Sequence, residues 1–484
     1  MVIFSNTLYA VGHVLALLGI LELLPAMFDA AAGNPDWKTF VWSCLLTTGF
    51  AGALIFGFGQ KNRLEVNRRE VYLLTTCLWL FAALIAAMPF YFSSLDISFT
   101  DAFFEAASGL TTTGSTVLSG LDDMPPGILV WRALLQWVGG VGIVVVGIAV
   151  LPMLQVGGMA LFRTESSDHS EKEYPRVAQL AGRVGAIYVL LTLLCTIAYS
   201  LLGMSFFDAA LHAMTTLSTG GFSTHDRSLG YFNSPAIEWA AALFMLSGAL
   251  PFVAYIRVLK GAPQMFWRDS QVRSLSLFVV VVSGLIALWL AVVSDISFFT
   301  ALRQSTFSVI SIATTTGFVT VDYTLWGPAA VGAFLLLSLV GGATGSTAGG
   351  IKTFRFSILW RAVIRNMKQM IHPNGVFRIT YSKRPVSTEV LSSVYLFFTI
   401  FVVSFALITL ALTIAGLDIV TAISGAATAL ANVGPGLGEI IGPTGNFASL
   451  PDSAKIILSL AMIAGRLELL TALVLFLPMY WRKG

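Results

Sequence analysis

Thr111-Thr112-Thr113-Gly114-Ser115 is the first of four short Thr- and Gly-rich stretches, each placed after a helix-length amphipathic segment and before a long apolar one. The other three are Ser218-Thr219-Gly220-Gly221-Phe222, Thr314-Thr315-Thr316-Gly317-Phe318 and Ala431-Asn432-Val433-Gly434-Pro435. If Gly114, Gly221, Gly317 and Gly434 are equivalent, the intervals between them are 107, 96 and 117 residues. Such self-similarity indicates a repeated structural unit. Four loops whose carbonyl groups surround one axis can replace the hydration shell of an ion, so the stretches predict a cation pore.

The composition indicates a membrane protein. Of the 484 residues, 56% are hydrophobic and only 11% are charged, whereas soluble domains carry about 25% charged residues. The three cysteines lie within apolar spans and have no motif spacing, so we interpret them as small core residues. Residues 1–6 contain neither a basic run nor a cleavage site, so we expect the start of a first membrane helix there.

Ten segments are long and apolar enough to cross a membrane. They lie near residues 7–28, 37–59, 70–92, 127–154, 183–204, 235–259, 274–294, 327–364, 392–416 and 454–481. Four shorter segments, near 99–112, 206–219, 301–315 and 419–432, lead directly into the Thr/Gly stretches and are typical of re-entrant half-helices.

These segments predict an all-α integral membrane protein, with two leading helices plus four outer-helix/pore-loop/inner-helix repeats around a central pore. The predicted units are a leading transmembrane helix pair at 1–69 and pore repeats at 70–154, 155–260, 261–385 (with a broken inner helix) and 386–484. Within the predicted pore helices, Asp101, Asp208 and Thr421 each stand 13 residues before the glycine, whereas Gln304 occupies that position in the third copy. Such residues are either helix N-caps or groups that meet ions.

The basic residues predict the orientation in the membrane. Five segments, 61–69, 163–183, 257–273, 355–384 and 482–483, hold 21 of the 28 Lys and Arg residues and lie on one side of the ten-span arrangement. By the positive-inside rule that side is the cytoplasm, so both termini are expected there and the Thr/Gly stretches face outward. Acidic residues predominate on the other side, where they either concentrate cations or are scattered surface charges.

The repeats, the four glycines and the leading helix pair resemble the potassium-translocating subunits of the Trk/Ktr/HKT superfamily, and the leading pair resembles the TrkH branch. The resemblance covers essentially the whole chain and implies a filter that selects potassium and rubidium over sodium and lithium. The second glycine is taken as Gly221 because Phe222 then aligns with Phe318. The implied potassium ligands are Thr111, Thr112, Thr113, Gly114, Thr219, Gly220, Gly221, Thr315, Thr316, Gly317, Asn432, Val433 and Gly434. The fourth stretch departs from the Thr-Gly form.

Residues 341–350 interrupt the third inner helix with five glycines, and no comparable glycine run occurs in the other inner helices. Each glycine disfavours a helix by about 1 kcal/mol relative to alanine, so we expect a break here only. The resemblance implies an intramembrane gate made of Gly341, Gly342, Gly345, Ser346, Thr347, Gly349, Gly350, Lys352 and Arg466. A phosphate-binding loop is the rival interpretation, but Ile351 stands where that motif requires lysine. For Arg466, an ion pair with Glu468 is the structural alternative.

Other functions fit the sequence less well. A coupled secondary transporter often has inverted repeats with two broken helices, whereas these repeats are parallel. An intramembrane enzyme needs a nucleophile and a base or a metal cluster, and the five histidines show no ligand spacing. We expect no nucleotide bound by this chain and no nucleic-acid partner. The resemblance implies a homodimer in the bacterial inner membrane, regulated by a cytosolic TrkA-like nucleotide-binding ring that docks on basic loops such as 365–385.

Overall fold

The computed structural model describes residues 2–59, 68–149, 173–294, 296–382 and 384–482. The expected boundary between the first two repeats, at residues 154 and 155, lies outside these ranges. So do six of the basic residues that predict the orientation. They are Lys61, Arg63, Arg163, Lys172, Lys383 and Lys483.

The chain begins with a helical hairpin, as the sequence predicts. Helix α1 (Val2–Leu21) continues into α2 (Leu23–Ala32), and the two form one apolar span that packs against α3 (Trp37–Phe58). Glu22, at the junction of α1 and α2, is buried and accepts a hydrogen bond from the Thr47 hydroxyl of α3 (3.2 Å). The exposed surface of the hairpin carries many large apolar side chains, such as Leu17, Ile20 and Leu46.

Four repeats follow, each with an outer helix, a pore helix and an inner helix. The outer helices are α4 (Arg68–Ala86) with α5 (Met88–Phe92), α10 (Glu173–Leu201), α15 (Ser270–Val293) and α19 (Thr388–Ile414). The pore helices are α6 (Phe99–Leu110), α11 (Phe206–Leu217), α16 (Phe298–Ala313) and α20 (Ile419–Ala431). The inner helices are α7 (Pro126–Ala149), α12 (Pro235–Ala249) with α13 (Phe252–Leu259), α17 (Pro328–Ser338), and α22 (Asp452–Arg466) with α23 (Leu470–Leu473).

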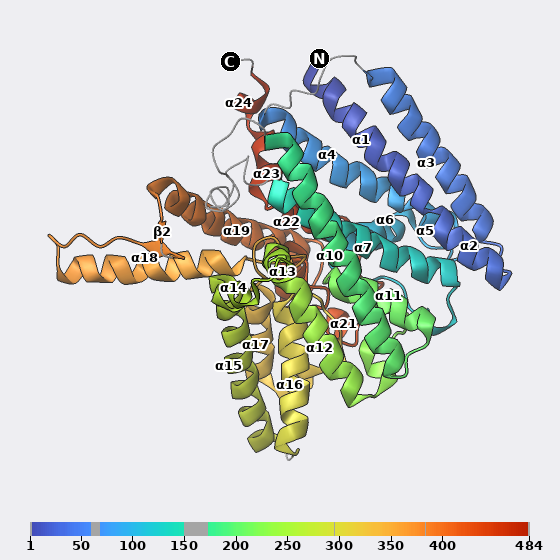
Figure 1. The fold of residues 1–484 in the computed structure, drawn as a ribbon. Coiled ribbons are helices and arrows are strands. Elements are labelled where there is room, and N and C mark those ends of the chain that lie inside the picture. The colour runs from blue at the N-terminus through green and yellow to red at the C-terminus, as the bar shows by residue number, and fades with distance from the viewer. Residues whose placement is uncertain (1, 60–67, 150–172, 295, 383, 483–484) are drawn as a thin grey trace.

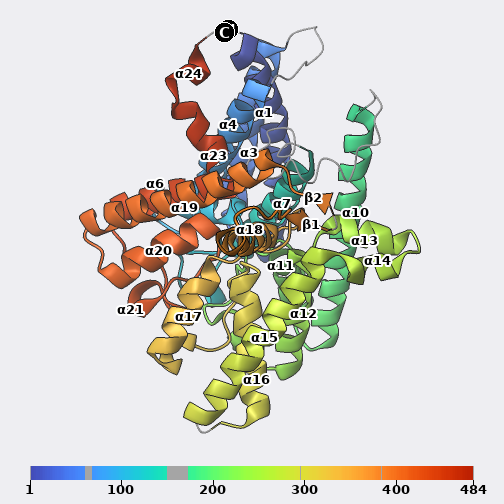
Figure 2. The same ribbon diagram turned by 90° about the vertical axis from the view of Figure 1, so that its left-hand side faces the viewer.

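Short elements connect and extend the repeats. They are η1 (Leu121–Asp123), η3 (Ser228–Phe232), α14 (Pro263–Arg268), η4 (Tyr323–Trp326), α18 (Thr353–Ile371), the antiparallel pair β1 (Thr380–Tyr381) and β2 (Arg384–Pro385), α21 (Gly438–Ile441), η5 (Val474–Phe476) and α24 (Pro478–Trp481). In the view of Figure 2, helix α18 is seen nearly end-on and the repeats are arranged around its axis. In Figure 1 the same helix projects from the body.

Asp101, Asp208 and Thr421 are not the N-caps of the pore helices, because each helix begins three residues before the position that such a cap would give. The caps are Ser98, Ser205, Ser297 and Asp418, whose side chains accept from the backbone N–H three residues on. Asp101 and Asp208 instead lie three residues after the caps, and each carboxylate accepts a hydrogen bond from the hydroxyl of the capping serine, Ser98 (2.8 Å) or Ser205 (2.7 Å). The third copy lacks this register because α16 has 16 residues, about one turn more than the 12, 12 and 13 of the others.

The expectation that only the third inner helix is broken is wrong. Helices α12 and α13 meet at an angle of 97°, and α22 and the α23–η5 segment meet at 104°. Pro251 ends the first of these helices because it has no N–H to donate, and Glu468 and Leu469 end the second with positive φ angles of 65° and 45°. Within the described residues, seven helical spans are long and apolar enough to cross a membrane, and each of these two bent pairs could form one more. Two of the seven spans join α1 to α2 and α4 to α5. The eighth predicted span, 327–364, is not one helix, because it is divided between α17 and the projecting α18.

The leading hairpin is joined to the first inner helix by a carboxylate. Asp29 of α2 is fully buried, and its Oδ1 accepts from the backbone N–H of Gly127 in the first turn of α7 (2.7 Å). The positive end of a helix dipole stabilises a negative charge in this position. A Cβ at residue 127 would collide with that carboxylate.

We therefore predict that Gly127→Ala destabilises the protein by displacing Asp29. Loss of a buried charged hydrogen bond costs about 1–3 kcal/mol, so the melting temperature in detergent should fall. Gly49→Ala is the matched control, because Gly49 lies in a helix with no atom within 4 Å of an added Cβ. An equal melting temperature for both variants would contradict the role of the Asp29 contact.

Candidate functional site

The four Thr/Gly segments, residues 111–114, 218–221, 314–317 and 431–434, have the same backbone conformation. The glycines Gly114, Gly221, Gly317 and Gly434 have φ angles of 89°, 76°, 82° and 102°. Two residues earlier, Thr112, Thr219, Thr315 and Asn432 have φ angles of 53°, 53°, 58° and 54°. In the second segment this pattern places Gly221, not Gly220, in the position of the other three glycines. The left-handed region suits glycine because it has no Cβ.

The segments form a closed ring in chain order. A Cβ on Gly114 would collide with the carbonyl oxygen of Gly220, and a Cβ on Gly221 would collide with that of Thr316. Similarly, a Cβ on Gly317 would collide with Val433 O, and a Cβ on Gly434 would lie 2.9 Å from Thr113 O. Each glycine therefore packs against the carbonyl group that precedes the glycine of the next repeat. Asn-Val-Gly, although different in sequence, occupies the fourth place in this ring.

The ring glycines adjoin a cavity. All four glycines line one cavity of about 80 Å³. In the described part of the chain, the carbonyl oxygens of Thr113, Thr316 and Val433 accept no protein hydrogen bond. The pore helices end immediately before the glycines, so the negative ends of their dipoles are directed at the ring. This arrangement favours a cation.

Hydrogen bonds between buried side chains stabilise the conformation of the segments. In the first, Thr111 and Thr113 hydroxyls lie 2.7 Å apart, and in the third, Thr314 and Thr316 hydroxyls lie 2.8 Å apart. The fourth segment uses an amide, since Asn432 Nδ2 donates to the Thr113 hydroxyl (3.0 Å) and to Met462 O (2.9 Å). These side chains are fully or almost fully buried.

A buried ion pair that the sequence analysis did not identify supports the outer side of the ring. Arg132 of α7 donates through Nε to Glu105 of α6 (2.8 Å) and through Nη1 to Ser223 O (2.8 Å). Glu105 also accepts from the Thr116 hydroxyl (2.9 Å) and from Val117 N (3.0 Å). The pair joins the chain after the first glycine to the chain after the second. In the sequence, the only indication of this ion pair is that an Arg and a Glu, 27 residues apart, both lie within apolar segments.

Acidic side chains near the mouth of the cavity are engaged in structural bonds. Asp226 accepts from the backbone N–H groups of Gly120 (2.9 Å) and Leu121 (3.2 Å). Asp122 contacts His225 (2.5 Å). Among the residues described, no three His, Cys, Asp or Glu side chains are placed to hold a metal ion together.

The glycine run forms an irregular loop, residues 339–352, which we call the central loop. It lies against the pore-helix ends, because Gly350 N donates to Ala431 O (2.8 Å) and Gly349 N donates to the Thr315 hydroxyl (2.7 Å). The Thr347 hydroxyl donates to Leu217 O (2.9 Å). These partners precede the glycines, whereas the 80 Å³ cavity adjoins the glycines themselves. The central loop and the cavity therefore lie at opposite ends of the ring.

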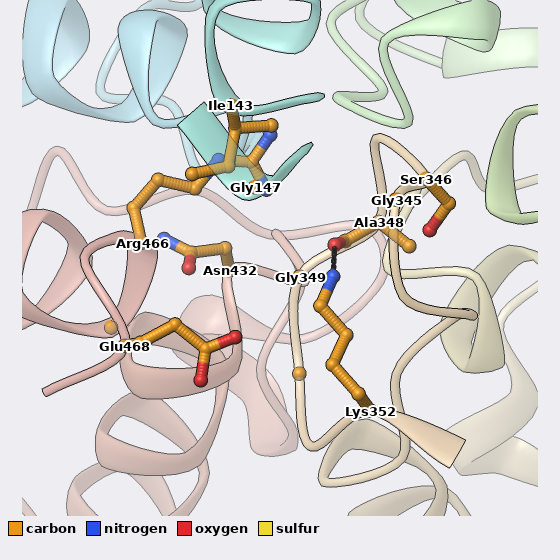
Figure 3. A pocket seen from close by; sticks show the side chains of 12 residues that line it. Ile143, Gly147, Gly345, Ser346, Ala348, Gly349, Lys352, Asn432, Arg466 and Glu468 are labelled. Atoms are coloured by element: carbon orange, nitrogen blue, oxygen red, sulfur yellow. Dashed lines mark hydrogen bonds between the residues drawn. The ribbon is translucent and has the colours of Figure 1, made fainter. Parts of the chain in front are cut away.

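Three cationic side chains and one carboxylate lie at the central loop, and Figure 3 shows Lys352, Arg466 and Glu468 among them. Lys352 Nζ donates to Ala348 O, and Arg466 Nη2 donates to Thr347 O (2.9 Å). Glu468 pairs with Arg355 of α18, so the alternative pairing of Glu468 with Arg466 does not occur. In the described structure Nε and Nη1 of Arg466 are buried and have no hydrogen-bond partner. Arg466 thus brings an uncompensated positive charge to the loop.

The predicted gate residues separate into two groups. Gly345, Ser346, Gly349, Gly350, Lys352 and Arg466 line a small cavity of about 30 Å³ together with Asn432. Gly341, Gly342 and Thr347 do not line it. They hold the ends and the turn of the loop through bonds such as Gly341 N to Ile351 O (3.0 Å).

Glycines in three inner helices allow close packing beneath the ring, a role that the sequence analysis did not assign. A Cβ on Gly139 would collide with Leu110 O, and a Cβ on Gly465 would collide with Leu430 O. In the second repeat, a Cβ on Gly248 would lie 2.9 Å from Leu217 O. In each case the carbonyl group belongs to the end of the pore helix of the same repeat.

Known proteins share this sequence and fold over nearly their full lengths. The chain is 43% identical to the Trk system potassium uptake protein TrkI of Halomonas elongata, with 99% of both chains covered. It is 37% identical to the Trk system potassium uptake protein TrkH of Escherichia coli K12, over 100% of this chain and 97% of the other. The crystal structure of the potassium transporter TrkH from Vibrio parahaemolyticus superposes with a TM-score of 0.92 at 34% identity, covering 99% of this chain and 100% of that one.

The family comparison agrees with the resemblance noted in the sequence. A family model described as TrkH, cation transport protein, matches residues 38–483. The same result supports the expectation that the chain is not an enzyme, because the family consists of transport proteins. Since the four-segment ring, the central loop and the apolar spans all accompany this match, the chain belongs to the TrkH family of cation transport proteins.

Proposed function

We propose that this multi-pass membrane protein takes up potassium across the bacterial inner membrane through a selective, channel-like pore. The observation that supports this most directly is the ring in which Thr113, Gly220, Thr316 and Val433 present carbonyl oxygens beside the four glycines. Carbonyl oxygens at fixed spacing replace water around a dehydrated cation. The relatives are potassium uptake proteins by name, which favours potassium as the transported ion. The preference for potassium and rubidium over sodium and lithium is part of the proposal.

The proposal also assigns a gate. The central loop crosses the path below the ring, where Lys352 and Arg466 add positive charge. Two unit charges about 4 Å apart interact by roughly 4 kcal/mol at an effective dielectric constant of 20. The loop must therefore move, or its charges must be compensated, before a cation passes at an appreciable rate.

Regulation is proposed to come from the cytoplasmic side, where both termini would lie. Helix α18 extends away from the ring and carries the basic residues Arg361, Arg365 and Lys368. Its first turn is tied to the gate region by the Arg355–Glu468 pair. A cytosolic nucleotide-binding ring of the TrkA type, docked on a homodimer of this chain, would reach the central loop through this helix.

Flux into liposomes that contain only the purified protein tests the ion specificity. We expect rubidium and potassium to enter faster than sodium and lithium, because the larger ions are held by the ring without contraction. Equal rates for all four ions would contradict a selective ring.

We predict that Gly317→Ser and Gly114→Ser reduce the preference for potassium over sodium. A side chain at either position collides with a ring carbonyl, Val433 O or Gly220 O, and displaces it. The relative permeability is measured in proteoliposomes. Gly120→Ser is the control, because Gly120 also has a positive φ (74°) but no atom within 4 Å of an added Cβ. Unchanged selectivity in both ring variants, with normal folding, would remove the filter assignment.

We predict that Arg466→Ala, or deletion of part of Gly345–Gly349, raises basal rubidium uptake while selectivity is kept. Removing the unpaired guanidinium lowers the electrostatic barrier, and each 1.4 kcal/mol corresponds to about tenfold in rate. Arg303→Ala serves as control because Arg303 pairs with Glu238 (3.0 Å) away from the loop. If both variants fold and their basal flux is equal to or lower than that of the unmodified protein, the gate assignment is wrong and Arg466 has a structural role only.

We predict that neutralising Arg365, Lys368 and Arg378 together weakens the binding of a cytosolic regulatory chain but preserves flux through the isolated protein. Lys368 and Arg378 are exposed, so their removal leaves no buried partner unsatisfied. Pull-down and liposome flux on the same preparation provide the measurement. Collapse of the isolated flux would instead place these residues in the pore or in its folding.

A further inference from the structure

The second Thr/Gly segment lacks the internal support that the first and third possess. In this segment the residue that precedes the ring glycine is Gly220, whereas in the other three segments it is Thr113, Thr316 or Val433. The hydroxyl pairs Thr111–Thr113 and Thr314–Thr316 therefore have no equivalent, since Ser218 has no side chain opposite it at residue 220. Some other group has to hold this part of the ring.

Gln136 of α7 occupies the missing position. Its side chain is fully buried, its Nε2 donates to Gly220 O (2.8 Å), and its Oε1 accepts from Phe222 N (3.0 Å). A Cβ at residue 220 would overlap the Gln136 amide group. The glycine at 220 and the glutamine at 136 are thus complementary, although they come from different repeats.

The backbone of α7 is itself held tightly around Gln136. One turn earlier, Arg132 bonds Glu105 and Ser223 O. One turn later, Gly140 approaches the second segment so closely that an added Cβ would lie 2.8 Å from the Ser218 Cβ. These contacts restrain α7 on both sides of Gln136, and α7 therefore positions the Gln136 amide group next to Gly220.

We propose that Gln136 is a positioning residue for ion selection, which fixes the second segment in place of an internal hydroxyl pair. The proposal rests on the proposed function of the ring. Gln136 holds Gly220 O, the carbonyl that packs against Gly114, and Phe222 N, which follows Gly221. Loss of the amide would release Gly220 O and Phe222 N, on either side of Gly221, from their hydrogen bonds. The carbonyl oxygens of the second segment could then move and coordinate smaller ions.

The test compares the potassium-to-sodium permeability ratio of four variants in proteoliposomes. Gln136→Ala and the similarly sized Gln136→Met remove both bonds, and we expect the ratio to fall roughly two- to tenfold, the equivalent of one net hydrogen bond. Gly220→Thr alone should also lower the ratio because of the overlap. The double variant Gln136→Ala/Gly220→Thr should recover most of it, since the introduced hydroxyl then faces Ser218 as the Thr113 hydroxyl faces Thr111.

Gln271→Ala is the matched control. Gln271 is another buried glutamine whose amide oxygen accepts from a backbone N–H, but its partner is Thr344 N of the central loop (2.8 Å) and not a residue of the ring segments. Its loss should leave the permeability ratio unchanged. Size-exclusion profiles confirm that each variant is folded.

The outcomes separate this inference from the proposed function. If Gly317→Ser lowers the ratio and both Gln136 variants do not, the ring is selective and Gln136 is only structural. If neither residue affects the ratio, the selective ring itself is wrong. If the double variant is no better than Gln136→Ala, the complementarity of residues 136 and 220 is overturned.

Discussion

The architecture depends on how closely four backbone segments approach one another. At the ring, each glycine lies directly against a carbonyl group of the next segment, and a single added carbon would collide or come within 2.9 Å. This constraint fixes the residue type at four positions and the order of the repeats around the axis. It also requires the pore helices to end together, which the inner-helix glycines Gly139, Gly248 and Gly465 permit by allowing close contact with the pore-helix ends.

Much of this arrangement is encoded in patterns that can be recognised in the sequence. Apolar length located the spans, and the repeated Thr/Gly stretches located the segments that form the ring. The tertiary partners were not recognisable, because nothing local links Gln136 to Gly220 or Arg355 to Glu468. The bend after α12 was missed for a similar reason, since one proline in an apolar run ends a helix or is tolerated depending on its neighbours.

The fourfold symmetry is a property of the backbone and not of the side chains. The four segments share their φ angles, yet they are held by two hydroxyl pairs, one external glutamine and one asparagine. The third pore helix is about one turn longer than the others, and only the third inner helix has the glycine-rich central loop. The side chains therefore differ both within and outside the ring, while the four glycines keep similar positive φ angles.

The pairing of Gln136 with Gly220 has an evolutionary consequence. In an assembly of four identical subunits, any substitution appears four times. A glycine in one loop and a compensating side chain in the neighbouring repeat would therefore have to fit at all four positions. A single chain with four unequal quarters accepts such a change in one place. Fusion of the repeats thus lets one quarter specialise, and it also makes the quarters no longer interchangeable.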